Sequence, residues 1–261
     1  MGGCYLKTEI NYQFFIEQYN QLAATYPGLE YGIDKLLDCF FVAGVLSFSA
    51  SFNQISIQDS YLIRIDIPWN FDLFHIPLAY ELAGRIPQSF HHYINGNLCL
   101  GINIANYEKL SQDCTLLGYV NNLLVPFLYA FSYYEKYGKM PFGNEGHDKD
   151  AVFLYFHEKF PGVPEDRLLD LIIYLYLPHA YGSHRPCLCG SGLRMRHCHF
   201  NLLKELIHIY PRDILLCNIK DFIIHFFKKN INYKSMFSPK ILNQFYREIT
   251  KDLKPNQEYM R

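Results

Sequence analysis

The stretch DCFFVAGVLSFSASFNQISIQDSYLIRIDIP, residues 38–68, decides the fold class. Apolar and polar side chains alternate along it, and β-branched and aromatic residues are frequent, as in strands with one buried face. The pattern predicts three strands, at residues 39–52, 54–58 and 60–67. We expect them to form an antiparallel meander without a parallel βαβ unit.

Helical patterns lie on both sides of this stretch. Residues 11–24 carry apolar side chains at helical spacing up to a Pro-Gly pair, and residues 110–137 repeat the pattern. We expect the second segment to cover the sheet, with Pro126 kinking it or starting another helix. Residues 77–82 predict a fourth, short strand. The predicted fold class is therefore α+β.

The C-terminal half also carries helical patterns. The polar, glycine-rich residues 138–150 predict a loop, and shorter helices are expected at residues 151–160 and 164–177. Beyond residue 199 the tail is again helical in its spacing, and Ser238 followed by proline is a typical helix start. We therefore expect a helical C-terminal region.

Composition indicates a globular chain. Its 261 residues, half of them hydrophobic, suffice for one or two packed cores. The longest apolar run, residues 123–131, contains a proline and is too short to span a bilayer. The eight cysteines lack the dense spacing of a secreted scaffold and no signal peptide precedes them, so we expect reduced thiols. These features predict a cytoplasmic protein without a membrane partner.

Charge is distributed unevenly along the chain. Residues 1–184 contain 10 Lys and Arg against 19 Asp and Glu, whereas residues 185–261 contain 14 against 6. The basic C-terminal part fits a polyanionic or acidic partner, and it fits equally an attraction between the two parts of the chain. The sequence leaves both interpretations open.

The most specific motif is CLCGSGLRMRHCH, which begins at Cys187. Cys187 and Cys189 are separated by one residue and Cys198 and His199 are adjacent, so a glycine-rich knuckle can fold four ligands into a tetrahedron around Zn²⁺. His197 is an alternative fourth ligand. A closed site of this kind is typical of structure or recognition rather than catalysis.

A second candidate for a functional site is the stretch SFHHYINGNLCLGI, which contains Cys99. Asn95 and Gly96 favour a tight turn that presents this cysteine, and His91 and His92 precede it. A thiolate in such a turn is accessible to a macromolecular substrate and is a good nucleophile. The alternative is structural, because a cysteine between two leucines is commonly a small buried hydrophobic residue.

Both motifs resemble known families. The cysteine and histidine motif is similar to the SEC-C motif, a small zinc module found at the C terminus of the SecA translocation ATPase and in many bacterial proteins. The matching features are the C-x-C-G-S-G opening, the basic Arg194 and Arg196, and the final Cys-His pair. This resemblance implies a bound Zn²⁺.

Residues 10–160 resemble the ubiquitin-conjugating (UBC) fold, with a helix, an antiparallel meander, a proline-bounded segment and the sequence Asn-Leu-Cys-Leu. The resemblance implies that Cys99 carries the C-terminal acyl group of a protein modifier as a thioester and passes it to a target lysine. The family's His-Pro-Asn tripeptide is replaced here, so His91, His92, Asn95 or Asn97 is left to stabilise the oxyanion.

The histidines before the turn, together with Glu145 and His147 in a later loop, resemble the ubiquitin-conjugating-like enzymes of bacterial antiphage (CBASS) systems. This resemblance implies a nucleotidyltransferase of the CD-NTase type as the modifier, handled through its C-terminal tail. An ATP-using activating enzyme or another acyl donor supplies the thioester. Glu145 and His147 either line the site or are ordinary surface residues.

These expectations divide the chain into a UBC-like conjugating domain (residues 1–160), a helical linker (161–184) and a SEC-C zinc motif with a helical tail (185–261). The alternative to a transferase is a non-catalytic UBC-like adaptor that binds a protein or, less favoured, a nucleic acid through its zinc module and basic tail. A hydrolase that pairs Cys99 with a neighbouring histidine is a third interpretation. Exposure of Cys99 beside room for an extended tail distinguishes the first two.

Overall fold

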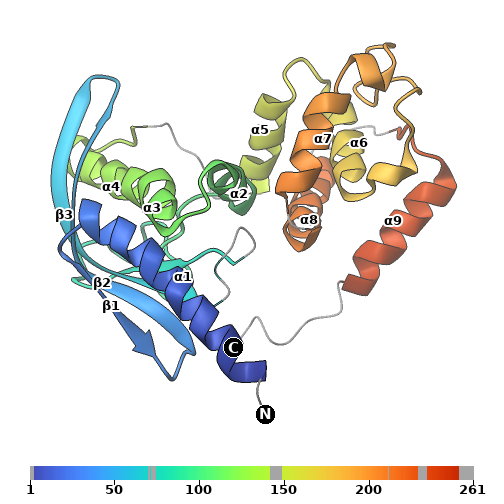
Figure 1. Ribbon diagram of the computed structural model, residues 1–261. Coiled ribbons are helices and arrows are strands. Elements are labelled where there is room, and N and C mark those ends of the chain that lie inside the picture. The colour runs from blue at the N-terminus through green and yellow to red at the C-terminus, as the bar shows by residue number, and fades with distance from the viewer. Residues whose placement is uncertain are drawn as a thin grey trace. The chain divides into compact units, whose positions relative to one another are not determined.

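The computed structural model describes residues 3–69, 71, 75–141, 149–210, 212–228 and 234–252. The chain forms two compact units, Met1–Glu145 and Gly146–Arg261, each of which is described by itself (Figure 1). The sequence analysis placed the boundary later, at residue 160, with a linker at 161–184. The division falls earlier because the helices that flank residue 160 pack with the C-terminal helices.

The first unit contains an antiparallel sheet. Its strands β1 (Leu29–Asp34), β2 (Cys39–Phe52), β3 (Ile55–Pro68) and β4 (Leu78–Glu81) lie side by side in sequence order. Each strand pairs antiparallel with the next. This confirms the α+β class and the antiparallel meander.

The long central hairpin differs from the prediction in its strand count. The second and third predicted strands form one strand, β3, which pairs with β2 from its first residue to its last. Asn53 and Gln54 close the hairpin with φ values of 47° and 66°. Left-handed φ at both central positions is what a type I′ turn requires, and this turn matches the twist of the flanking strands.

One face of the sheet is buried under helices. The inward residues of the central hairpin include Phe40, Val42, Leu46, Tyr61, Ile63, Ile65 and Ile67, all nearly inaccessible. Helix α1 (Gly3–Thr25) packs the ring of Phe15 on that of Phe40, with centroids 4.1 Å apart. Each such side chain contributes about 1.5–3 kcal/mol when it is fully buried.

The helical cover continues after β4. It comprises α2 (Asn103–Gln112), α3 (Leu116–Tyr119), a π turn (Val120–Leu124) and α4 (Val125–Tyr137). Pro126 is near the start of α4, and the amide of residue 125 bonds to the carbonyl of residue 120, five residues back. The widened turn therefore precedes the proline, which cannot donate a backbone hydrogen bond.

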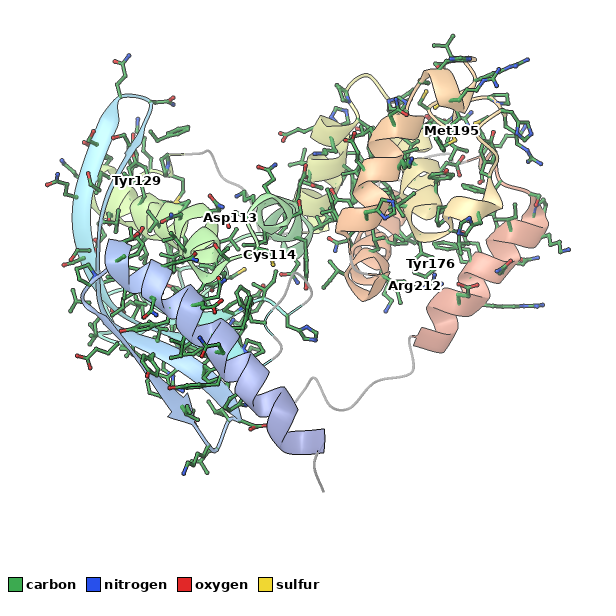
Figure 2. All side chains as sticks on the ribbon, viewed as in Figure 1. Asp113, Cys114, Tyr129, Tyr176, Met195 and Arg212 are labelled. Carbon is green, nitrogen blue, oxygen red and sulfur yellow. The ribbon has the colours of Figure 1, made fainter. Side chains whose placement is uncertain are left out.

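Figure 1 shows α1, α3 and α4 on the same side of the sheet. Two hydroxyl groups connect α4 to β3. Tyr129, labelled in Figure 2, donates from its hydroxyl to the carbonyl oxygen of Ile55 at 2.9 Å. The hydroxyls of Ser132 and Tyr61 lie 2.7 Å apart. These bonds satisfy polar groups at the edge of an otherwise apolar interface.

The second unit is helical in the part of it that the structure describes. Its helices are α5 (Lys149–Lys159), α6 (Glu165–Tyr176), α7 (Phe200–Ile209), α8 (Arg212–Lys228) and α9 (Pro239–Asp252). Short 3₁₀ turns at Pro178–Ala180 and Met195–His197 flank a loop-rich segment between α6 and α7. The expected helices at residues 151–160 and 164–177 and in the tail agree with these bounds to within a few residues.

Aromatic and apolar side chains hold these helices together. The ring of Phe222 on α8 packs against Phe153 and Phe156 of α5, with centroids 5.3 and 6.3 Å apart. Helix α6 is buried from residue 168 to 176 and contacts both α7 and α8. Figure 2 shows Tyr176 of α6 beside Arg212, whose guanidinium lies 4.1 Å from its ring centroid. The segment expected to be a linker is therefore part of a core.

Candidate functional site

Cys99 follows a short hairpin between β4 and α2. His92 and Leu98 form an antiparallel bridge, and the amide of Cys99 donates to the carbonyl of His91 at 2.7 Å. Buried Leu98 also donates from its amide to the carbonyl of Ala79 in β4. The hairpin is thus attached to the edge of the sheet, and Cys99 has a fixed place beside it.

The Cys99 thiol is half-buried and lies near the Gly101 carbonyl and the Tyr93 side chain. Its Sγ lies 3.8 Å from the carbonyl oxygen of Gly101, a residue with φ of 126° that favours glycine. The hairpin pairing also brings Tyr93 near the thiol. Partial burial, and then the neighbouring Cys99 thiol, raise the pKa of Tyr93 above its ordinary value. The phenol therefore stays protonated at neutral pH.

The other candidate residues of this stretch have distinct environments. The ring of His91 packs edge-on against Phe90 and Phe127, with centroids 4.7 and 6.4 Å apart. Nδ1 of His92 lies 2.9 Å from the carbonyl oxygen of Phe90. Asn95 is exposed at the tip of the turn. The structure thus brings the two histidines and Cys99 onto one hairpin, with Asn95 at its far end.

Asn97 differs from Asn95 because it is buried. Its side chain is 4% exposed, and among the described residues its Oδ1 has no hydrogen-bond partner. A buried amide oxygen without a partner costs about 1–3 kcal/mol. Such an atom is commonly satisfied by a water molecule or by a change of state at a functional site. Glu145 and His147, the other candidates, lie outside the described residues.

In the second unit, four side chains form a cluster suited to a metal ion. The ligand atoms of Cys187, Cys189, Cys198 and His199 all lie within 4.8 Å of one another. The sulfurs of Cys189 and Cys198 are 3.6 Å apart, and Nδ1 of His199 is 3.4 and 3.2 Å from the sulfurs of Cys187 and Cys198. The cysteines are free thiols, so the cluster is not a disulfide.

The choice between the two histidines follows from this geometry. Nε2 of His197 accepts a hydrogen bond from Nε of Arg196 at 3.1 Å, and the residue is exposed. The ring of His199 instead packs edge-on against Phe160, at 5.8 Å between centroids, with Nδ1 among the sulfurs. His199 is therefore the histidine of the cluster.

The loop that carries the cluster is folded like a small hairpin. Pro186 and Arg194 form an antiparallel bridge, and the amide of Cys187 donates to the carbonyl of Leu193. Gly190 and Gly192 have φ values of 80° and 76°, which let the chain turn between the first and second ligand pairs. The glycines of the motif thus allow the turn that separates Cys187 and Cys189 from Cys198 and His199.

The thiols of the cluster differ in acidity. Burial opposes ionisation of Cys189, yet hydrogen bonds from Ser191 and the neighbouring sulfurs lower its pKa to about 7. Burial raises the pKa of Cys187 and raises that of Cys198 to about 11. A bound cation favours the ionised form of all three, so metal binding releases protons.

The surface around the cluster is basic. Residues 171–204 contain no Asp or Glu, and within this span Arg185, Arg194 and Arg196 are exposed. Cys187, Cys189 and Met195 between them are buried. Figure 2 labels Met195, which marks the position of this segment in the fold. The knuckle therefore presents arginines around a buried ligand set.

Comparisons with protein-family models, with curated proteins and with solved structures found no match. Among the described helices, none is long and apolar enough to cross a bilayer. The sequence patterns did not single out Tyr93, which the hairpin places near Cys99. The signal for it was the Asn-Gly turn, because a hairpin folded around that turn pairs Tyr93 with Asn97 and brings it near Cys99.

Proposed function

We propose that this chain is a ubiquitin-conjugating-like transferase that carries a protein acyl group as a thioester on Cys99. The observation that carries the proposal is the position of a half-buried thiol after a hairpin, between the last strand of an antiparallel meander and the following helix. The order of helix, four strands, cysteine and helices is the order that the UBC resemblance implies. A nucleophile attached to a rigid sheet edge is held in a defined orientation.

The chemistry that follows is acyl transfer in two steps. In loading, the Cys99 thiolate attacks the activated C-terminal carbonyl of the modifier, and the activating group leaves. In discharge, a lysine amine attacks the thioester carbonyl, a C–N bond forms, and the C–S bond breaks to return the thiolate. The amine loses its extra proton to solvent or to a base. A separate activating enzyme or acyl donor supplies the energy.

His91 and His92 are the candidates for the oxyanion partner, because both flank Cys99 through the hairpin. A hydrogen bond to the developing oxyanion contributes about 10²–10³-fold to the rate. Asn95 lies at the exposed tip and is suited to contact the incoming chain. This assignment predicts that a histidine variant slows discharge more than loading.

We further propose that the cluster of the second unit binds one Zn²⁺. A tetrahedral zinc site with Zn–S bonds of about 2.3 Å places its sulfurs about 3.8 Å apart, and the Cys189 and Cys198 sulfurs lie 3.6 Å apart. Three thiols and one imidazole match the ligands zinc prefers. With all four positions taken by protein, the ion is structural, like that of a SEC-C module.

The CBASS resemblance supports a modifier with a free C-terminal tail, such as a CD-NTase-like nucleotidyltransferase, in the bacterial cytoplasm. Loading requires an extended chain to reach a half-buried thiol, which a flexible C-terminal tail provides. Purified protein is incubated with such a modifier, the activating partner and ATP. One modifier mass should be added through a bond that reductant cleaves. Cys99→Ala should abolish this adduct, whereas Cys114→Ala, at a half-buried cysteine of the same unit, should retain it.

A second candidate, the adaptor, is favoured by the exposed arginines and the absence of acidic residues over residues 171–204. A basic surface attracts an acidic protein or a polyanion. Failure of the wild type to load with each candidate modifier, together with partner binding that Arg194→Glu abolishes, would replace the transferase with this function.

A further inference from the structure

The hairpin of Cys99 sets a tyrosine beside the thiol. His92 and Leu98 are bridge partners, so the residues on either side of this pair belong to the opposite face of the hairpin. Tyr93 and Asn97 are joined there by a backbone bond of 2.9 Å. Cys99 lies on the same face, diagonally across from Tyr93. Diagonal neighbours of this kind are within reach of an aromatic side chain.

The electrostatics agree with this register. The neighbouring Cys99 thiol helps to raise the pKa of Tyr93, and the Tyr93 side chain remains 43% exposed. Because partial burial raises the pKa of Tyr93, the phenol is a proton donor throughout the physiological range. A thiolate beside it is an acceptor. When Cys99 is ionised, the protonated phenol is therefore a donor for a hydrogen bond to its sulfur.

We propose that Tyr93 is a positioning residue that stabilises the ionised form of Cys99 by donating its hydroxyl hydrogen bond to Sγ. The role in acyl transfer rests on the proposed function. In loading, this bond holds the thiolate in one orientation before it attacks. In discharge, the amine forms the C–N bond, the C–S bond breaks, and the departing electron pair remains on a sulfur that accepts from Tyr93. The phenol keeps its proton in both steps.

The donor is well placed for a leaving group rather than for a carbonyl. Its diagonal neighbour on this face of the hairpin carries the sulfur, the atom on which negative charge appears as the thioester breaks. The ring of His91 packs against Phe90 and Phe127, and Nδ1 of His92 lies beside a backbone carbonyl. The hairpin thus divides two tasks, sulfur stabilisation by the tyrosine and oxyanion stabilisation by a histidine.

The test measures the ionisation of Cys99 without any modifier. Full-length wild type, Tyr93→Phe and Tyr134→Phe are alkylated with iodoacetamide from pH 6 to pH 10, and the Cys99 peptide is quantified by mass spectrometry. Tyr134 is the matched control, since it is also 43% exposed and its ring packs on Phe90. The titratable groups of the hairpin and of α2, among them His91 and Glu108, are the same in all three proteins.

Tyr93→Phe removes the donor and keeps the ring. We expect the midpoint of its alkylation profile to rise by about one pH unit. At pH 7 the rate should fall about threefold, because the tenfold loss of thiolate is offset by about threefold from the greater nucleophilicity of a more basic sulfur. The high-pH plateau should rise for the same reason. Tyr134→Phe should follow the wild type.

An unchanged profile in folded Tyr93→Phe would overturn the inference. If Tyr93→Phe loses its melting transition, the alkylation profile of Tyr93→Leu, which also lacks a donor, is measured instead. The proposed function fails separately. A shifted profile without loading by any modifier would remove the transferase and leave the tyrosine–thiol pair. Normal loading with an unshifted alkylation profile would remove the role of Tyr93 and leave the transferase.

Discussion

The chain uses cysteine in two different settings. In the first unit, Cys99 is a half-buried thiol whose identified polar neighbours are a phenol and a backbone carbonyl. In the second unit, Cys187 and Cys189 are 0% and 6% exposed, and a third sulfur and an imidazole lie within 4.8 Å of them. The same side chain is thus a half-buried thiol after a hairpin in one unit and part of a cluster that could hold a metal ion in the other.

The contrast teaches that neighbours, not the thiol, decide the chemistry. A cluster of soft donors is satisfied by a cation, and a cation that occupies all four positions leaves no sulfur to react. A thiolate outside such a cluster is a nucleophile. The two units also differ in how they are held together, because the first has a sheet and helix core and the second is packed from helices, with the cluster on the loop between α6 and α7.

Removal of the metal should give the largest effect. Structural zinc contributes about 10–16 kcal/mol of apparent binding free energy in small domains. Cys189→Ser should therefore lose about one equivalent of metal by elemental analysis and make the second unit sensitive to protease. Melting of the first unit should persist. Cys114→Ser is the control, and a fully folded second unit without metal would contradict the expectation.

A core substitution should act on the first unit alone. Leu46 is fully buried in β2 and faces the helices, whereas its neighbour Val45 is 47% exposed on the other face. Leu46→Ala should lower the free energy of unfolding of the first unit by about 2–5 kcal/mol, and Val45→Ala should change it by about 0.5 kcal/mol or less. Denaturant titration measures both. Metal content should stay at the wild-type value, and a loss would show that the units do not fold independently.

Low pH should lower the free energy of unfolding of the first unit through one ion pair. Two hydrogen bonds from Arg85, at 2.9 and 2.7 Å, lower the pKa of Asp59 to about 2. Because the folded pKa is depressed, the stabilisation is present above about pH 4 and is lost as pH falls toward 2. Because the Arg85 side chain is 36% exposed, solvent screens the pair and the stabilisation amounts to about 1 kcal/mol. Unfolding of the first unit at several pH values checks this, and Asp59→Asn should flatten the dependence.

Helix caps should give the smallest difference. Thr115 accepts from the amide of Gly118 at 2.9 Å at the start of α3, and Ser238 accepts from Ile241 at the longer distance of 3.4 Å at the start of α9. Thr115→Ala should therefore destabilise the first unit by about 1 kcal/mol, and Ser238→Ala should cost the second unit about 0.5 kcal/mol. Thermal melting of each variant ranks them. A larger loss at Ser238 would mean that α9 depends on its cap.

Much of the fold is predictable from local pattern. The alternation in β2 and the helical spacing of α6 are strong because one face, or nearly the whole element, is apolar. Strand β1 was missed because its sequence, LEYGID, has a single buried residue, and its pairing with β2 is tertiary. Helix α2 was missed because no side chain caps its start. The boundary after residue 145 depends on packing that no local pattern encodes.

The two candidate sites also differ in how much of each the sequence predicts. The candidate metal ligands are close in sequence, so their spacing alone predicted the cluster, and only the choice of His199 over His197 needed coordinates. The surroundings of Cys99 depend on hairpin register, and the Asn-Gly pair marks the turn without showing which side chains reach the thiol. Tyr93 was therefore overlooked, and the buried, unpaired oxygen of Asn97 had no sequence signal.

The π turn before Pro126 has a consequence for how the length of this helix varies. The wide turn holds one residue more than an α-helical turn, so the helical faces before and after it are both buried. Deleting one of residues 120–124 restores the regular ladder but sets the proline ring against the carbonyl four residues back. Deletion and replacement of the proline are thus coupled. In a lineage descended from this chain, a version one residue shorter here is expected to have lost Pro126 as well.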